Sequence, residues 1–231
     1  NLPGIKQQLH HGGNAANTAL ALARLGISSH LICRTDALGF HLLKYFLEKD
    51  GVDLSGVKTD GALAITTAKE FGAEHNNVML GDPGSVADFS FDRLTDHDHQ
   101  LVASADIVGI VNWNLNRFGT TLASKVAEEA KKQGAKTFFD SGDPSPRVHD
   151  IPELMKQVLM NPAVDIIGLN ENELRYYSDS TGTSQQDLMN AAQLLKKKIP
   201  ARLDIHTAQF SGTIKNTSIT VPTLSLPTVY R

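Results

Sequence analysis

The second half of the chain alternates short apolar runs with stretches of helical spacing, and this alternation constrains the fold most. The clearest run is 106–111, where an Asp precedes Ile-Val-Gly-Ile-Val, typical of a strand buried on both faces of a sheet. Apolar residues at helical spacing follow at 120–132. Further strands are expected at 135–140, 164–169 and 202–206, further helices at 152–160, 171–177 and 184–198, and a closing hairpin at 209–221. In the first half, the sequence predicts a short apolar strand at 29–33 and an amphipathic helix at 40–49. The pattern predicts a three-layer, Rossmann-like α/β fold, with a mainly parallel sheet, right-handed crossovers and helices on both faces.

Composition and charge narrow the class of protein. The 231 residues suffice for one sizeable domain, or for one with a small appendage, and the 41% hydrophobic and 20% charged residues are ordinary for a globular protein. A net charge of −3 without a basic stripe predicts no nucleic-acid partner. The single Cys33 excludes an internal disulfide and a cysteine-built metal cluster. Because no signal peptide or membrane-spanning run is visible, we expect a cytoplasmic protein without a membrane partner.

A glycine pair lies directly before the first strong helix pattern. Gly12 and Gly13 leave space beside the backbone and lead into an Ala- and Leu-rich run that ends near Gly26. The N–H groups at the start of such a helix point toward whatever lies in front of it. Asn14 and Asn17 are three residues apart, so both amides can face the same space, and amides suit the hydroxyls of a sugar or nucleoside. A plain loop before a packed helix remains an alternative, whereas a P-loop and a dinucleotide fingerprint are excluded by the missing residues.

Residues 58–90 have a different character. Strand-like runs at 62–69 and 77–80 are separated by polar turns, and no long helix intervenes. We therefore expect a small β lid at 58–90, and an α/β core made of 1–57 and 91–231. A hairpin on the surface is the simpler alternative.

Polar residues follow four of the expected strands. In an open parallel sheet, ligands bind beyond the carboxyl ends of the strands. This rule selects Asn112, the loop that begins at Asp140, the segment Asn170–Glu173, and Thr207 onward. A carboxylate beside an amide can hold Mg²⁺ through water molecules, although an ordinary helix cap with an acidic first turn would look the same.

Several of these motifs occur in the order found in one family. The Gly-Gly-x-x-x-Asn of Gly12–Asn17, running into Ala-Arg-Leu-Gly, resembles the first signature of the ribokinase-like (PfkB) carbohydrate kinases. Asn170 and Glu173 match the family's Asn-x-x-Glu motif. The segment from Asp140 to Arg147 is similar to its Asp-x-Asn-Pro-x-Arg motif, but Gly142-Asp143 departs from the Asn register of that motif. Thr207 matches a segment that lines the nucleotide site, whereas Gln209 stands near the position of the family's glycine.

The resemblance implies an activity and a set of roles. It implies ATP-dependent phosphorylation of a sugar or nucleoside hydroxymethyl group, with Mg²⁺ as cofactor and a possible homodimer through the lid. Acceptor hydroxyls would be bound by Gly12, Gly13, Asn14, Asn17 and Asn112. The nucleotide would be bound by Asn170 and Thr207, and Glu173 would serve the metal.

The resemblance also implies that the sequence is a piece of a longer protein. The family's Gly-Ala-Gly-Asp motif, which carries the catalytic Asp, is expected beyond Arg231, and its first strand is expected before Asn1. We therefore name no catalytic base in this sequence. Two alternatives remain: a non-catalytic or regulatory binding protein with the same fold, and an NAD- or FMN-binding doubly wound domain. The second is weakened because no strand with the required glycine pattern closely precedes Gly12.

Overall fold

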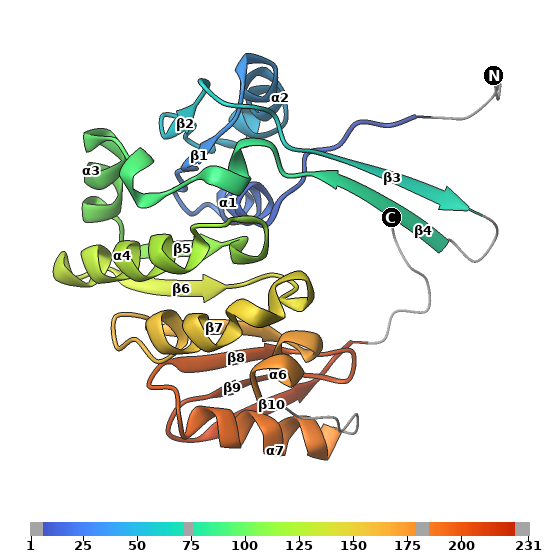
Figure 1. Cartoon of the computed structure of the whole chain (residues 1–231), viewed down its shortest axis with the longest axis vertical. Coiled ribbons are helices and arrows are strands. Elements are labelled where there is room, and N and C mark those ends of the chain that lie inside the picture. Colours follow the sequence, from blue (N-terminus) through green and yellow to red (C-terminus); the bar gives the residue numbers. More distant parts are fainter. Residues whose placement is uncertain (1–6, 72–75, 179–184, 225–231) are drawn as a thin grey trace. The chain divides into compact units, whose positions relative to one another are not determined.

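A computed structural model describes residues 7–71, 76–178 and 185–224 of the chain (Figure 1). The chain forms two compact units, Asn1–Phe89 and Ser90–Arg231, which are described separately below. The hairpin of the expected lid falls in the first unit, together with the first two helices. The separate lid domain at 58–90 stays a prediction.

The first unit is built on two helices, and the second of them begins at a side-chain cap. Helix α1 spans Asn14–Arg24 and α2 spans Ala37–Leu47, followed by a 3₁₀ turn at Glu48–Asp50. The helix predicted at 40–49 begins earlier because the Asp36 side chain accepts a hydrogen bond from the Gly39 amide at 2.7 Å. A small core holds these elements together, and its buried members are Ala16, Ala19, Leu20, Leu31, Leu47 and Val52.

A short parallel pair of strands accompanies these helices. Strand β1 is Cys33–Arg34 and pairs with β2, Val57–Lys58. Upstream of β1 the same two segments approach again only through an isolated bridge between His30 and Asp53. The strand expected from the run Ser29–Cys33 is thus reduced to its last residue, because the ladder is interrupted between the bridge and β1.

The expected small sheet is a two-stranded antiparallel hairpin. Strand β3 spans Ile65–Phe71 and β4 spans Asn76–Asp82, and a 3₁₀ turn at Gly84–Asp88 follows. Val78, Met79 and Leu80 are between 50% and 64% exposed. A two-stranded sheet with such exposed apolar side chains has no core of its own.

The second unit contains a six-stranded sheet in the order β10-β9-β8-β7-β6-β5 (Figure 1). Strands β5 to β8 are parallel, and β9 and β10 are antiparallel. Their bounds are Ile107–Val111, Lys136–Asp140, Ile166–Asn170, Arg202–His206, Phe210–Ile214 and Ser218–Pro222. The predicted α/β class, the parallel-dominated sheet and the closing hairpin are confirmed.

The helices of this unit follow the strands in the expected alternation. The α-helices are α3 (Asp96–Ser104), α4 (Gly119–Lys132), α5 (Ile151–Leu154), α6 (Glu171–Ser178) and α7 (Gln185–Lys196). Short 3₁₀ segments occupy Phe91–Arg93, Trp113–Leu115 and Ser145–Asp150, and a π-helical turn at Met155–Leu159 continues α5. The sequence analysis missed α3, although a reciprocal cap between Thr95 and Asp98 marks its start.

The main core lies between the sheet and these helices. Because β5 to β8 are adjacent in chain order and crossovers are right-handed, α4 to α7 pack on one face of the sheet. Buried members of this core include Phe139, Leu154, Ile167, Leu174, Leu188, Leu195 and Leu203. On the other face, Ile107, Ile219 and Val221 are between 56% and 65% exposed. None of the helices in the described residues is long and apolar enough to cross a membrane.

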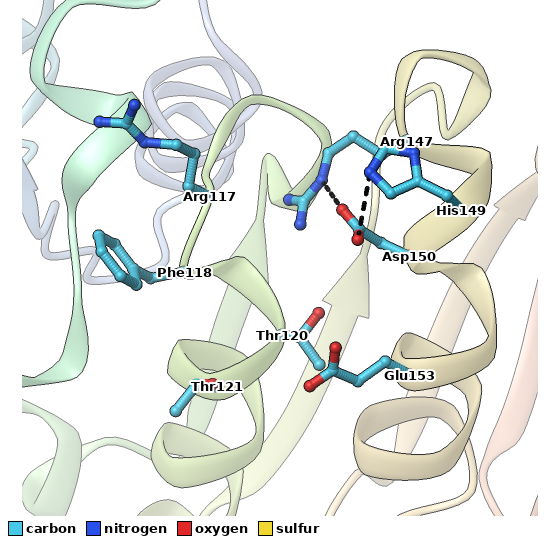
Figure 2. Close-up of a pocket in the computed structure, with 8 residues that line it drawn as sticks. All are labelled: Arg117, Phe118, Thr120, Thr121, Arg147, His149, Asp150 and Glu153. Atoms are coloured by element: carbon cyan, nitrogen blue, oxygen red, sulfur yellow. Dashed lines mark hydrogen bonds and ion pairs between the residues drawn. The ribbon is translucent and has the colours of Figure 1, made fainter.

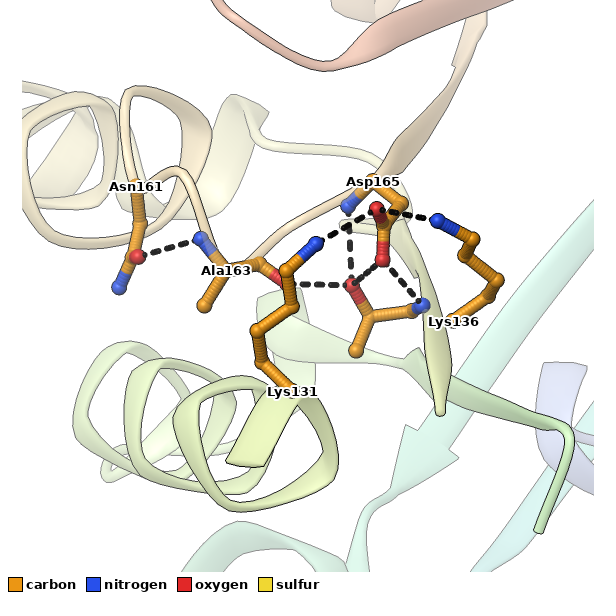
Figure 3. A network of polar contacts seen from close by, with 6 residues as sticks. Lys131, Lys136, Asn161, Ala163 and Asp165 are labelled. Carbon is orange, nitrogen blue, oxygen red and sulfur yellow. Dashed lines mark hydrogen bonds and ion pairs between the residues drawn. The ribbon is translucent and has the colours of Figure 1, made fainter. Parts of the chain in front are cut away.

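A polar cluster fixes the amino ends of two central strands (Figure 3). Asp165 Oδ1 accepts hydrogen bonds from Lys131 Nζ at 3.0 Å and Lys136 Nζ at 3.3 Å, and its Oδ2 accepts one from the Thr137 amide at 3.1 Å. Burial raises the pKa of Asp165, but the hydrogen bonds from Lys131, Thr137 and Lys136 outweigh it, so this pKa lies below its ordinary value. The carboxylate thus ties α4, β6 and β7 together at the edge opposite the strand carboxyl ends.

Candidate functional site

The carboxyl ends of the four parallel strands share one edge of the sheet. Val111 at the end of β5 pairs with Asp140 at the end of β6, and Asn170 at the end of β7 pairs with His206 at the end of β8. The structure therefore brings four predicted site segments of the second unit, at Asn112, Asp140, Asn170 and Thr207, to neighbouring strand ends.

Asn170 and Glu173 form a reciprocal cap at the start of α6. Glu173 Oε2 accepts a hydrogen bond from the Asn170 amide and Oε1 accepts one from Asn170 Nδ2, each at 2.8 Å. In return the Glu173 amide donates to Asn170 Oδ1 at 2.9 Å. The Glu173 side chain is buried, at 1% exposure. The capping arrangement considered as an alternative in the sequence analysis is therefore present.

The electrostatics around Glu173 are unfavourable for a negative charge. Burial, together with the smaller effect of the charges of Asp140 and Asp143, raises the pKa of Glu173 from 4.5 to about 7, against the backbone hydrogen bond from Asn170. A cation near these carboxylates would relieve that repulsion.

The donor set suits Mg²⁺ only through water. Carboxylate and amide oxygens are the ligands a hard cation prefers. However, both Glu173 oxygens are already held by Asn170, and no group of three His, Cys, Asp or Glu in metal-binding arrangement occurs among the described residues. The residues present therefore fit a cation that keeps most of its hydration shell.

The loop after β6 links three strand ends. The Asn114 amide donates to the Ser141 carbonyl at 2.9 Å, and the Tyr177 hydroxyl donates to Ser141 Oγ at 2.5 Å. Gly142 has a φ of 65°, and a Cβ there would lie 2.7 Å from Asn114 Oδ1. The missing side chain of Gly142 thus lets this loop close against Asn114.

Two residues near this edge were not singled out from the sequence. Tyr177 lies four residues after Glu173 on α6, and burial raises its pKa above the ordinary value. Thr120 on α4 accepts a hydrogen bond from Trp113 Nε1 at 2.9 Å. The helical spacing of Glu173 and Tyr177 was a usable signal, because residues four apart share a helix face. Nothing in the sequence marked Thr120.

Asn112 begins a tight turn whose carbonyl groups are bound by Arg147. Asn112 follows β5 with a φ of 66°, in the left-handed region. Arg147 donates from Nη1 to the Trp113 carbonyl at 2.7 Å and also to the Asn116 carbonyl. It lines a cavity of about 350 Å³ with residues of α4 and α5 (Figure 2). Trp113 itself is 2% exposed, so it is a core residue.

Thr207 closes the turn between β8 and β9. Its Oγ1 accepts hydrogen bonds from the Gln209 amide at 3.1 Å and the Phe210 amide at 2.9 Å. Beside this turn lies an open groove of about 500 Å³, on the sheet face away from α4 to α7. Asp140, Gly168, Asp204 and His206 are among its lining residues.

The glycine turn belongs to the first unit and is open. Gly13 precedes α1 with a φ of 87°, and a Cβ placed on Gly12 or Gly13 would meet no described atom within 4 Å. Asn14 and Asn17 are both exposed on the first turn of α1. The local arrangement predicted for these four residues is present, while their relation to the strand-end residues of the second unit stays a prediction.

Known proteins similar to this chain are sugar and nucleoside kinases. A sequence model described as pfkB family carbohydrate kinase matches residues 3–207. Ribokinase of Haemophilus influenzae is 26% identical over 204 residues, which cover 85% of this chain and 60% of that protein. The chain thus spans less than two thirds of this relative.

Solved structures share the fold at low sequence identity. Arabidopsis thaliana ribokinase, complexed with ribose and ATP, has a TM-score of 0.75 at 18% identity, over 100% of this chain and 74% of that one. Adenosine kinase from Sinorhizobium meliloti has a TM-score of 0.77 at 17% identity, over 95% of this chain and 65% of that one. Fructokinase from Xylella fastidiosa has 0.75 at 18% identity, over 98% of this chain and 72% of that one. The chain therefore has the ribokinase-like α/β fold and belongs to the pfkB family of carbohydrate kinases.

Proposed function

We propose that the protein containing this chain transfers a phosphoryl group from ATP to a hydroxymethyl group of a sugar or nucleoside, in the cytoplasm. The observation that carries the proposal is the family match over residues 3–207, in a fold whose strand ends gather Asn112, Asp140 and Asn170 at one edge. The ribose and ATP named for the Arabidopsis thaliana ribokinase structure support this choice of acceptor class and donor.

Acceptor binding is assigned to the glycine turn and to Asn112. The empty space beside Gly12 and Gly13 and the exposed amides of Asn14 and Asn17 support a contact with hydroxyl groups. Asn112 is half-buried at the end of β5, and its side chain caps no backbone group of the following turn.

The nucleotide and metal are assigned to the other strand ends. Asn170 and Thr207 would contact the nucleotide. The Thr207 hydroxyl already accepts hydrogen bonds from the Gln209 and Phe210 amides, so Thr207 would act by fixing the turn that faces the nucleotide. Glu173 would hold a hydrated Mg²⁺, which when bound neutralises charge on the transferred phosphoryl group. The catalytic base is not assigned to any residue of this sequence.

The β3–β4 hairpin is assigned one of two roles, covering the bound acceptor or pairing with a second copy of the chain. Its exposed apolar side chains, Ile65, Val78, Met79 and Leu80, support a role in covering the acceptor or in pairing with a second copy. Analytical ultracentrifugation of the parent and a Leu80→Lys variant separates the two roles. Loss of a dimer in the variant supports pairing, and a parent that sediments as a monomer contradicts it.

The activity is tested with the full-length protein, ATP, Mg²⁺ and a panel of sugars and nucleosides. We expect ADP formation that depends on one acceptor class and a phosphomonoester signal in the ³¹P spectrum. A reaction without acceptor measures background ATP hydrolysis. Absence of turnover with every acceptor would contradict the proposal.

One observation favours a second candidate, a non-catalytic binding protein of the same fold. Glu173 is turned inward, and both of its oxygens are held by Asn170. Equilibrium binding distinguishes the two functions, because a binding protein retains an acceptor in the presence of ATP and Mg²⁺ without forming ADP.

A further inference from the structure

The turn after β5 contains an unusual backbone conformation. Asn112 is the single non-glycine residue with positive φ in the described part of the chain. Left-handed backbone costs a non-glycine residue free energy, least for Asn, and persists where the surroundings hold it in place. Asn112 lies at the edge of the sheet where ligands bind in open α/β folds. The contacts that fix the conformation of this turn therefore matter for ligand binding.

Arg147 holds the turn from the next strand-to-helix connection. Its Nη1 donates to the carbonyls of both Trp113 and Asn116, at 2.7 Å for Trp113. Its guanidinium also lies over the Trp113 ring, 4.2 Å from the centroid. A single planar side chain thus fixes two carbonyls and one ring of the turn.

Arg147 is itself held in place. Its Nε donates to Asp150 Oδ2 at 2.7 Å, and Asp150 also lies 3.4 Å from His149 Nε2 (Figure 2). The Arg147 side chain is 15% exposed. Charge-assisted hydrogen bonds in such a half-enclosed site are stronger than those in open solvent.

The edge of the Trp113 ring that carries Nε1 is fixed by α4. Trp113 Nε1 donates to Thr120 Oγ1 at 2.9 Å. Gly119 approaches so closely that a Cβ there would lie 2.8 Å from Trp113 Cδ1. Arg147 over the ring and α4 at its edge thus hold Trp113 in place.

We infer that Arg147 is a positioning residue that clamps the turn Asn112–Asn116 and so sets how Asn112 meets the acceptor. The inference rests on the proposed function, because it takes Asn112 as an acceptor contact. The residue acts through the turn rather than by touching the acceptor. A lysine keeps the charge but has neither the planar fork nor the stacking surface, so it does not replace Arg147.

The test uses Arg147→Lys and Arg147→Met in the full-length protein. Trp113 is the only tryptophan of the 231-residue sequence, so fluorescence and near-UV circular dichroism near 290 nm report its surroundings within this sequence. In full-length protein that carries another tryptophan, a Trp113→Phe variant identifies the Trp113 signal. Arg24→Met, which removes an exposed arginine paired with Asp50, is the matched control.

We expect both Arg147 variants to change the Trp113 signal and to weaken acceptor binding roughly tenfold, which corresponds to about 1.4 kcal/mol. Affinity for ATP should stay within twofold of the parent. Arg147→Lys guards against a simple folding defect, because it keeps the cation beside Asp150. An unchanged Trp113 signal would refute the clamp. Unchanged acceptor affinity in variants with an altered signal would refute the positioning role. A parent that binds no acceptor would refute the proposed function itself. Failure of the proposed function is thus distinguished from failure of the clamp, which is judged on a parent that does bind an acceptor.

Discussion

The buried carboxyl of Glu173 makes the stability of the second unit depend on pH near neutrality. Burial raises the pKa of Glu173 from 4.5 to about 7. Between these values the folded protein binds more protons at Glu173 than the unfolded chain does, so the contribution of this residue falls as the pH rises. Below pH 4.5 the contribution is fully present, and above about pH 7 it is lost. At about 1.4 kcal/mol per pKa unit, the full loss is at most about 3.5 kcal/mol.

Glu173→Gln removes this dependence, because an amide does not titrate. The glutamine keeps one oxygen that accepts from the Asn170 backbone amide, but it lacks the second oxygen that accepts from Asn170 Nδ2. The cap of α6 is therefore weakened by an amount that does not depend on pH. As the pH rises from 4.5 to 8, the parent loses this contribution and the variant does not. The free energy of unfolding of the variant minus that of the parent should therefore increase by about 2–3 kcal/mol over this range.

The assay is urea denaturation of the parent and the variant at several pH values. Glu171→Gln is the control, since Glu171 lies on the same helical turn and is half-exposed beside Arg175. Parallel stability curves for parent and Glu173→Gln across this pH range would refute the reasoning. A Mg²⁺ site at this edge predicts in addition that Mg²⁺ stabilises the parent more at pH 8 than at pH 5, and that the variant requires more Mg²⁺ for turnover.

Three further perturbations test other parts of the account. Asn17→Ala should weaken acceptor binding by roughly 1–3 kcal/mol, measured by equilibrium titration, and unchanged affinity would remove Asn17 from the site. Asp165→Asn should lower the free energy of unfolding by about 1–3 kcal/mol at neutral pH, because it breaks a hydrogen-bonded carboxylate. Since the pKa of Asp165 is lowered, this loss should shrink as the pH falls below 3.8, and a loss that grows there would contradict the assignment. Gly142→Ala should destabilise the protein by about 1–3 kcal/mol. The loss should exceed that of Gly134→Ala, since Gly134 also has a positive φ but a Cβ there meets no described atom within 4 Å; equal urea midpoints would contradict this.

The strands of the sheet could be predicted because their sequence signal is local. Runs such as Ile107–Val111 contain apolar residues on both faces, a pattern typical of parallel strands, although Ile107 is 61% exposed on this strand at the end of the six-stranded sheet. Once the strands are placed, the rule for open α/β sheets selects Asn112, Asp140 and Asn170 without knowledge of any contact. The alternation of the chain therefore predicts both the fold class and the edge where the polar residues gather.

Other features depend on contacts that the sequence does not display. The inward direction of Glu173 follows from its reciprocal cap with Asn170, and a spacing of three residues fits a cap and a metal site equally well. The role of Arg147 depends on Trp113, 34 residues earlier in the chain. The strand expected at 29–33 is short because its partner segment pairs only at an isolated bridge and at β1. These outcomes are tertiary, and local patterns do not determine them.

The proposed function places the nucleotide and the metal at the carboxyl ends of the parallel strands. The most direct test of this placement is paramagnetic broadening of NMR signals. Mn²⁺-ATP, in which Mn²⁺ replaces Mg²⁺, is titrated into isotope-labelled full-length protein, and amide signals are followed by NMR. The account predicts the strongest broadening for Asn170, Glu173 and Ser141, and little change for Thr137 and Asp165 at the opposite edge of the sheet. Broadening that is uniform, or strongest at Thr137 and Asp165, would contradict it.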